Sequence, residues 1–321
     1  MKMYKKVMAA ALAGVMTVSM SATAFAADDD GYILKATNED SKSSDNDLVI
    51  AIEGSVSSMD PANIPDTNAI SATRGVYETL VSFDENQELT GKLAESWEVS
   101  DDSLTYTFKL RQGVKFQDGT DFNAAAVKAN YDYTLVIKLT QAWAPFINRL
   151  TQFCIISPAA LEEYGNDIMN HPCGTGPYVC TEWEEGDHTS FERNDDYWGD
   201  KPGVDTVTIK EVPEAGARTA MLQTGEADFI YPTPSDQIEA IKGTDDVNIL
   251  TTDSNIMRYV TLNMDLEQLS DVKVRQAMNY AIDKDAYIQL MYSGYGKPAT
   301  SVVPSIIGGY EEQEAYTYDV D

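Results

Sequence analysis

Five consecutive apolar residues at positions 48–52 place the strongest constraint on the fold of this chain. The run reads Leu48-Val49-Ile50-Ala51-Ile52 and holds no polar residue. A strand with one face in water alternates apolar and polar residues, so this unbroken run predicts a strand buried on both faces. Such strands are typical of sheets that are covered on both sides, which favours a layered fold of strands and helices.

Strand and helix patterns are mixed along the rest of the chain, which predicts an α/β fold. Period-two residues predict half-buried strands, and residues of period 3.6 behind a capping side chain predict helices. We expect strands at 104–110, at 135–139, around Val207 and Ile209, and at 258–264. We expect helices at 124–133 after Asn123, at 215–224 before Gly225, in a short segment with Ile238 and Ile241 capped by Ser235, and from Asp271 onward with Val274, Ala277, Met278 and Ala281 on one face.

The first 26 residues have the order of a secretory signal peptide. Three of the first six residues are lysines, an apolar run covers 7–18, and Ala24-Phe25-Ala26 is a small-x-small cleavage site. This order predicts cleavage after Ala26, and a retained N-terminal anchor is the alternative. Residues 27–47 are polar and predict a disordered tether. We therefore expect an extracytoplasmic protein, in the periplasm or at the cell exterior, without membrane insertion after cleavage.

The chain is strongly acidic, with 52 Asp and Glu against 23 Lys and Arg and a net charge of −29. Removing the three lysines of the leader leaves 20 basic residues against 52 acidic ones, a net charge of −32. A chain of this charge repels phosphate backbones and anionic membranes, so binding to nucleic acid or to a membrane surface is not expected.

Three cysteines, Cys154, Cys173 and Cys180, are compatible with one disulfide in an exported protein. Cys173 and Cys180 lie seven residues apart and are the favoured pair. The alternative is three reduced thiols, because an odd count leaves at least one cysteine free in any case.

Catalytic motifs are absent from the sequence. The segment Gly174–Val179 begins like a dinucleotide fingerprint, but Val179 replaces the last glycine and Pro177 lacks an N–H group. The two histidines, His171 and His188, show no metal-ligand spacing, so neither a metal nor a cofactor is expected. A pair of catalytic carboxylates would leave no local motif, so a secreted hydrolase stays open as the alternative function.

Several segments, in their order along the chain, resemble one known family. They are Gly91–Ser100 (GKLAESWEVS), Leu104–Arg111 (LTYTFKLR), Gly113–Ala124 (GVKFQDGTDFNA), Gly174–Tyr178 (GTGPY), Arg193–Trp198 (RNDDYW) and Val272–Asp283 (VKVRQAMNYAID). With these motifs, residues 48–321 resemble the family 5 extracellular solute-binding proteins, which are binding components of peptide, dipeptide, nickel and related ABC importers.

The resemblance implies a two-lobe architecture of the type II periplasmic-binding-protein kind, with an incomplete second lobe. It implies lobe I at 48–73 and 172–258, a subdomain inserted into lobe I at 74–171, and the start of lobe II at 259–321. Ligands of such proteins lie between the lobes, and closure of the lobes removes water from the ligand. No covalent chemistry is needed, so the protein is not expected to be an enzyme.

The function that the resemblance implies is capture of a small solute for the permease subunits of an ABC importer. Short peptides are the favoured ligand of a monomeric binding protein, whereas a nickel complex and a sugar stay open. A structural or adhesive surface protein would show internal repeats, and the sequence has none.

Two departures from the family pattern concern length. Family members continue well beyond Asp321, so we expect a C-terminally truncated chain. The helix pattern through Tyr133 also runs directly into the strand pattern at Thr134, without Gly, Pro or Asn between them. An internal deletion near 134–136 is the interpretation, and a divergent short loop is the alternative.

Candidate ligand-binding residues follow from position in the family pattern. The first group leaves the strand at 48–52 and comprises Glu53, Gly54, Ser55, Val56, Ser57 and Ser58. The second group lies where the family chain crosses between lobes and comprises Asn255, Met257, Arg258 and Tyr259. A turn at Ser57 and an ion pair at Arg258 are the structural alternatives to ligand contact.

Overall fold

The computed structural model describes residues 46–63, 66–84, 88–123, 126–127, 133–244, 247–251, 253–254, 256–307 and 310–320. The expected signal peptide and nearly all of the expected tether lie outside these residues. The chain divides into two compact units. The first runs to Pro232 and includes Thr244–Asn248, and the second comprises Thr233–Gly243 and Ile249–Asp321.

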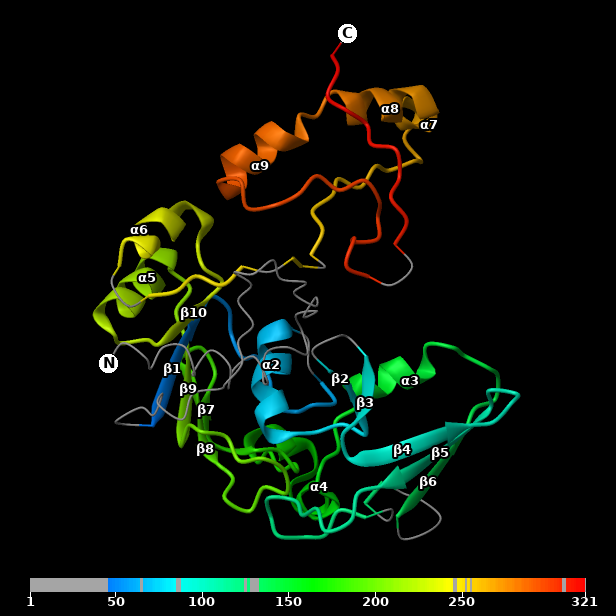
Figure 1. Cartoon of the computed structure of the whole chain (residues 1–321), viewed down its shortest axis with the longest axis vertical. Helices are drawn as coiled ribbons and strands as arrows, with labels where there is room; N and C mark the ends of the chain where they lie inside the picture. The colour runs from blue at the N-terminus through cyan, green and yellow to red at the C-terminus, as the bar shows by residue number, and fades with distance from the viewer. Residues whose placement is uncertain are drawn as a thin grey trace, which may run out of the picture. The chain divides into compact units, whose positions relative to one another are not determined.

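A five-stranded sheet forms the framework of the first unit, in the order β10-β1-β9-β8-β7 (Figure 1). Its strands are β1 (Asp47–Ile52), β7 (Tyr178–Glu184), β8 (His188–Arg193), β9 (Thr206–Glu211) and β10 (Phe229–Tyr231). β1 pairs in parallel with β9 and with β10, so Ile50 lies beside both Ile209 and Phe229. β8 runs antiparallel to both of its neighbours.

β1 is the buried strand that the apolar run at 48–52 predicts. Leu48, Ile50, Ala51 and Ile52 are at most 3% exposed, which confirms the expectation. The half-buried Val49 is fixed through its backbone, because its N–H donates to Asp228 Oδ2 (3.0 Å) and its carbonyl accepts from the Asp228 N–H (2.8 Å). The side chains of the strand are therefore buried on both faces, and its backbone hydrogen bonds are made inside the protein.

Two helices pack against this sheet. α2 (Thr67–Val76) begins at Asp66, whose side chain accepts a hydrogen bond from the Ala69 amide (2.8 Å), and it packs on β7. α5 (Ala215–Thr224) packs on β10 and β1 and ends at Gly225. Gly225 adopts φ +80°, a left-handed conformation that glycine takes without strain and that commonly ends a helix. The predicted helix at 215–224 is confirmed.

A second hydrophobic cluster gathers residues 80–173 around smaller sheets. β2 (Val81–Phe83) pairs with β3 (Leu89–Gly91), and β5 (Thr105–Leu110) lies between β4 (Ala94–Val99) and β6 (Thr134–Lys138). Tyr106, Phe108 and Leu110 alternate inward from β5, as period two predicts. The helical segments of this region are α3 (Phe146–Arg149), η1 (Leu150–Gln152), α4 (Pro158–Tyr164) and η2 (Gly165–Asn170).

The second unit is helical, with η3 (Ser235–Gln237), α6 (Ile238–Lys242), α7 (Glu267–Ser270), α8 (Val272–Tyr280) and α9 (Lys284–Tyr292). Asp271 caps α8 by accepting from the Lys273 amide (2.8 Å), which confirms the predicted helix start. The apolar face of α8 is not covered: Val274 is 41% and Met278 is 37% exposed. Among the described residues from Ile249 onward, none is buried.

Three local predictions from the sequence are not confirmed by the structure. The strand predicted at 258–264 is wrong, because residues 256–263 are neither strand nor helix and have no neighbouring strand to pair with in the described chain. Ser235 does not cap α6; it lies within η3, whose preceding residue is Pro234. Most of the helix expected at 124–133 lies outside the described residues, although Asn123 Oδ1 does accept from the Ala126 amide (3.2 Å).

The possible disulfide between Cys173 and Cys180 is not formed. Cys154, Cys173 and Cys180 are all free thiols, which was the alternative. Cys180 belongs to β7, where its Sγ lies 3.6 Å from the Glu182 carbonyl oxygen. The chain before it is held at the end of α2, since the Gly176 amide donates to the Val76 carbonyl (2.8 Å). Burial raises the pKa of Cys173 to about 11 and that of Cys180 to about 12, so both thiols stay protonated at neutral pH.

Candidate ligand-binding site

The carboxyl ends of three parallel strands, β10, β1 and β9, meet at one edge of the large sheet. The Glu53 amide after β1 donates to the Tyr231 carbonyl of β10 (3.0 Å), and the Val212 amide after β9 donates to the Ile52 carbonyl (2.8 Å). In open α/β sheets, ligands bind outside the carboxyl ends of the strands. A ligand-binding site is therefore expected at this edge, where the segment 53–58 lies.

Glu211 and Trp183 hold the segment that leaves β1. The Val56 amide donates to Glu211 Oε1 (2.8 Å), and the Val56 carbonyl accepts from Trp183 Nε1 (2.8 Å). Glu211 is the last residue of β9 and Trp183 belongs to β7. Val56 itself is fully buried, so both polar groups of its backbone need these partners.

The serines of this segment have structural partners of their own. Ser57 Oγ donates to Asp66 Oδ2, the carboxylate that also caps α2. Ser58 is buried, and its Oγ accepts from the Asp60 amide (3.1 Å). Ser57 thus has the structural role that was the alternative to ligand contact, because it bonds the side chain that caps α2.

Glu53 and Ser55 differ from the other residues of the segment, because one has a carboxylate that faces solvent and the other has a buried hydroxyl without a partner among the described residues. The Glu53 side chain is 60% exposed. Ser55 Oγ is buried, and no hydrogen-bond partner for it exists among the described residues. An unsatisfied buried hydroxyl costs about 1–3 kcal/mol, and a ligand or water bound at this edge would remove that cost.

Behind Glu53 lies a buried arginine. Arg218 of α5 is 2% exposed, and its Nη1 donates to the Val212 and Pro213 carbonyls, both at 2.8 Å. Its Nη2 lies 3.9 Å from Glu53 Oε2, and its Nε has no partner within the described part of the chain. The guanidinium thus places positive charge directly below the exposed carboxylate and ties the ends of β1 and β9 to α5.

The structure brings the first predicted group together at this edge of the first unit. Met257, Arg258 and Tyr259 belong to the second unit, where Tyr259 is 81% exposed, and Asn255 lies outside the described residues. Sequence reasoning missed Glu211, Trp183 and Arg218. The position of Glu211 at the end of a recognisable strand was the available sign of a role in the site. Only the pairing of β9 with β1 shows that Glu211 lies beside the segment 53–58.

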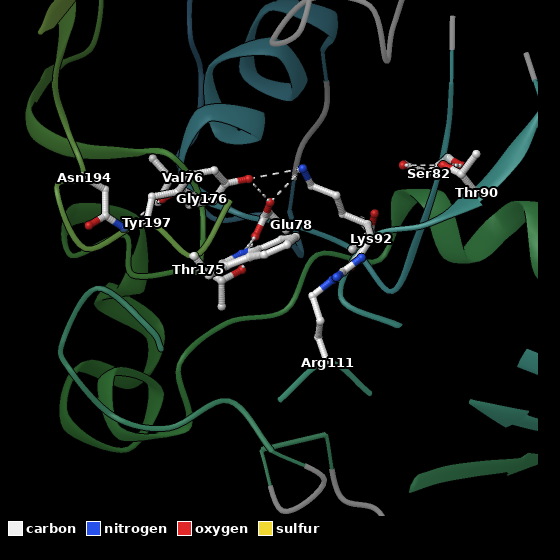
Figure 2. A network of polar contacts seen from close by, with 12 residues as sticks. Val76, Glu78, Ser82, Thr90, Lys92, Arg111, Thr175, Gly176, Asn194 and Tyr197 are labelled. Atoms are coloured by element: carbon white, nitrogen blue, oxygen red, sulfur yellow. Dashed lines mark hydrogen bonds and ion pairs between the residues drawn. The ribbon is translucent and has the colours of Figure 1, made fainter. Parts of the chain in front are cut away.

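A second polar cluster, around Glu78, contrasts with this open edge (Figure 2). Glu78 is 4% exposed, and Lys92 Nζ lies 3.0 Å from its Oε1. Tyr197 donates to Oε1 (2.7 Å), whereas Trp198 Nε1 (2.7 Å) and Thr175 Oγ1 (2.9 Å) donate to Oε2. Both oxygens of the carboxylate are therefore fully used by the protein.

The Glu78 network joins three of the segments that carry the family resemblance. Lys92 comes from Gly91–Ser100, Thr175 from Gly174–Tyr178, and Tyr197 from Arg193–Trp198. The glycines beside Thr175 have a steric role, because a Cβ on Gly174 or Gly176 would collide with the backbone at the end of α2. These motifs are scaffold, which is why they indicate a family and not a ligand.

The geometry of the edge suits binding and does not resemble a catalytic centre. Among the described residues of the segment 53–58, each serine hydroxyl either bonds a carboxylate or backbone group or has no partner, and none contacts a histidine. A serine nucleophile requires a general base within hydrogen-bond reach. One set of potential metal ligands lies elsewhere in the described chain, at the turn between β7 and β8, where Glu184, Asp187 and His188 come together.

Comparison with known proteins identifies the family. The profile of the bacterial extracellular solute-binding proteins, family 5 (middle region) matches residues 88–135 and 127–321. The chain belongs to this family. The glutathione-binding protein GsiB of Escherichia coli (strain K12) is 36% identical over 337 positions, which cover 95% of this chain and 62% of GsiB. GsiB of Salmonella typhi is 37% identical, over 85% of this chain and 59% of that protein.

Solved structures show the same fold. The periplasmic binding protein DppA of Helicobacter pylori in complex with the peptide STSA superposes with a TM-score of 0.74 at 27% identity, over 85% of this chain and 64% of DppA. NikZ of Campylobacter jejuni in complex with Ni(L-His) gives a TM-score of 0.74 at 27% identity, over 85% and 61%. The α/β periplasmic-binding-protein fold expected from the sequence is thus confirmed, and the chain spans about three fifths of the length of these relatives.

Within the described residues, no helix has both the length and the apolar character needed to cross a bilayer.

Proposed function

We propose that the protein is the extracytoplasmic solute-binding component of an ABC importer, which captures a small solute and delivers it to permease subunits. Membership of family 5 supports the class of function. The observation that carries the proposal in this chain is the carboxyl edge of β10, β1 and β9, where Glu53 is exposed and Ser55 Oγ is unsatisfied. A binding protein sets specificity by differential affinity and needs no reactive group.

Short peptides are the proposed ligands of this site. Glutathione, the ligand named for the GsiB relatives, is itself a tripeptide, and the DppA neighbour was solved with the peptide STSA. The AppA neighbour of Bacillus subtilis, 25% identical with a TM-score of 0.75, was solved with a nonapeptide. An exposed carboxylate and an unsatisfied hydroxyl at a strand end can bind the ammonium and amide groups of a peptide. Glu53 and Ser55 are the proposed contacts at this edge. Asn255, Met257, Arg258 and Tyr259 stay proposed ligand-binding residues from their position in the family pattern.

The proposed division of the chain keeps the expected boundaries. One hydrophobic cluster joins residues between 48 and 77 to residues between 178 and 209, and the other lies almost wholly between 80 and 173. This separation supports a subdomain at 74–171 within a lobe I of 48–73 and 172–258. The proposed start of lobe II at 259–321 falls inside the second compact unit, which itself begins earlier, with Thr233–Gly243 and Ile249. The leader at 1–26 is proposed to be cleaved, and N-terminal sequencing of secreted protein should find Ala27 first; a chain that still begins with Met1 would contradict this.

A missing internal stretch near 134–136 is also proposed. The family match is split into 88–135 and 127–321, which overlap close to this point. The alignment with GsiB runs over 337 positions although it covers 95% of a 321-residue chain, so the relative has residues that this chain lacks. Both observations favour a deletion over a divergent short loop.

Ligand screening tests the proposed function. Thermal unfolding of the chain extended to the length of its relatives should shift upward with members of a peptide library, because a ligand that binds only the folded state stabilises it. Glu53→Gln and Ser55→Ala should weaken that shift, whereas Glu98→Gln on the exposed face of β4 should not. Stabilisation by sugars or a nickel complex, with none by peptides, would overturn the ligand class.

A further inference from the structure

The turn between β7 and β8 gathers three side chains of metal-binding chemistry. Glu184 and His188 lie directly opposite each other in the antiparallel register, and Asp187 immediately precedes His188. Ligand atoms of the three residues all lie within 4.8 Å of one another. Side chains at opposite positions share one face of the sheet with Cβ atoms about 5 Å apart, so the hairpin itself sets this grouping.

The backbone of the turn is fixed on both sides. The Asp187 amide donates to the Glu184 carbonyl (3.0 Å), and the Asp187 carbonyl accepts from the Glu211 amide of β9 (2.8 Å). Gly186 has φ +86°, which closes the turn without strain. The three side chains therefore project from a framework that does not have to be ordered by a bound ion.

Glu182 orients the imidazole from outside the group. His188 Nδ1 lies 2.6 Å from Asp187 Oδ2, and His188 Nε2 lies 3.3 Å from Glu182 Oε2. The His188 side chain is only 22% exposed. A histidine that binds a metal through one ring nitrogen commonly donates the other N–H to a carboxylate, which fixes the ring. Nδ1 faces the group and Nε2 faces its orienting carboxylate, as that arrangement requires.

Charge at the turn favours a cation. Glu182, Glu184 and His188 share one face of the hairpin, because residues two apart on a strand and residues opposite each other point the same way. Lys210 of β9 lies opposite His188 and is the basic neighbour of the group. Three carboxylates against one ammonium group leave net negative charge, whereas Trp183, between the two acids of β7, points to the other face and reaches Val56.

We propose that Glu184, Asp187 and His188 bind a divalent transition-metal ion such as Zn²⁺, with Glu182 holding the imidazole. Zinc bonds to imidazole nitrogen and carboxylate oxygen are about 2.0–2.2 Å, which places the ligand atoms of one ion about 3–4 Å apart. Small rotations of the exposed Glu184 and Asp187 side chains reach this spacing. When the ion binds Nδ1, any proton on that nitrogen is released to water, while Nε2 keeps its proton and donates it to Glu182. Three protein ligands leave a fourth position for water or another donor.

Calorimetric titration of the metal-free, untagged full chain with Zn²⁺ tests this site. One saturable site per chain is expected, with affinity at least about tenfold lower in His188→Ala and about 10–100-fold lower in Glu182→Gln, which removes the orienting carboxylate. Glu184→Gln and Glu185→Gln form a matched pair, because each removes one carboxylate from the same turn. Only the first should weaken binding, and Cys180→Ser should leave the affinity unchanged.

Three outcomes would overturn the proposal. Equal losses in Glu184→Gln and Glu185→Gln, or several weak sites that 0.3 M salt abolishes, would show diffuse attraction of cations to an acidic surface. Tight binding of Ca²⁺ in place of Zn²⁺ would show that oxygen ligands alone form the site. If thermal unfolding of the metal-free His188→Ala chain is unchanged, any loss of affinity for Zn²⁺ comes from the missing imidazole and not from a damaged fold.

Discussion

At the scale of single residues, the protein separates carboxylates that hold the fold from carboxylates that face solvent. Glu78 is 4% exposed and receives three side-chain hydrogen bonds as well as the ion pair with Lys92. Lys92 also lies 5.4 Å from the centre of the Trp198 ring, and the guanidinium of Arg111 lies 4.7 Å from the same ring. A buried carboxylate of this kind cannot lose a partner without leaving an unpaired charge or dipole.

Glu78→Gln should therefore lower the free energy of unfolding by about 3 kcal/mol. If the side-chain NH₂ group of the glutamine faced Thr175 and Trp198, it would meet two groups that are themselves hydrogen-bond donors. Breaking a buried ion pair costs about 3–5 kcal/mol. The lower end applies because Lys92 is 37% exposed and solvent screens its charge. Urea unfolding followed by tryptophan fluorescence measures this loss. Glu95→Gln, which removes a surface pair with Lys109 at 3.4 Å, is the control and should change stability by less than about 1 kcal/mol.

Asp118 makes stability depend on acid pH. Partial burial opposes ionisation of its carboxylate, but hydrogen bonds from Ser157 and Thr120 outweigh it and hold the pKa below the ordinary value. A lowered pKa in the folded state contributes stability above the unfolded value of about 3.9, and this contribution is lost as pH falls through the folded value. Melting temperatures of wild type and Asp118→Asn should thus differ at pH 7 and converge below about pH 4. A difference that stays constant as the pH falls below about 4 would contradict this account.

At the scale of elements, local sequence pattern predicted the segments whose burial follows their own periodicity. β1, β5, α5 and the start of α8 follow from an apolar run, an alternation, a glycine stop and an aspartate cap. The strand expected at 258–264 failed because alternation produces a strand only where another strand pairs with it. Sequence order likewise placed Glu53–Ser58 after β1, but Glu211 and Arg218 join them only through the pairing of β9 with β1, which no local pattern encodes.

Two glycines should respond in opposite directions to alanine. Gly216 in α5 has open space where the methyl group of an alanine would lie, so Gly216→Ala should raise the free energy of unfolding by about 0.5–1 kcal/mol through higher helix propensity. Gly174 packs against the backbone of Val76 and Tyr77, so Gly174→Ala must displace the end of α2 and should destabilise the protein. Thermal unfolding compares both variants with wild type, and equal effects of the same sign would contradict the assigned roles.

At the scale of the whole molecule, burial is distributed unevenly between the two units. The buried apolar residues of the first unit form two clusters around the sheets, whereas α8 and α9 bury no residue. Amide hydrogen exchange should therefore be much slower in β1 than in α8, because exchange reports the free energy of local opening. Mass spectrometry of exchanged peptides measures this, and equal protection of the two elements would contradict it.

The uneven burial also limits binding by this 321-residue chain. Tight binding requires that most of the ligand surface be removed from water, and the described residues from Ile249 onward bury none of their own side chains. We expect calorimetry to show no peptide binding tighter than about micromolar for the chain as it stands. Sub-micromolar binding, with cooperative unfolding of the whole chain, would contradict this expectation.

The position of β1 in its sheet also determines the order in which the protein can fold. β1 is the first strand of the described residues, but its neighbours β9 and β10 are synthesised only after most of the first unit, the last residue of β10 being Tyr231. At about 5–20 residues per second, Ile52 waits about 10–40 s for its partner strand. Pairing between strands that lie so far apart in the sequence is also slow to form. The topology thus delays the formation of native structure, and this delay would keep the chain threadable for the export that the leader at 1–26 is proposed to direct.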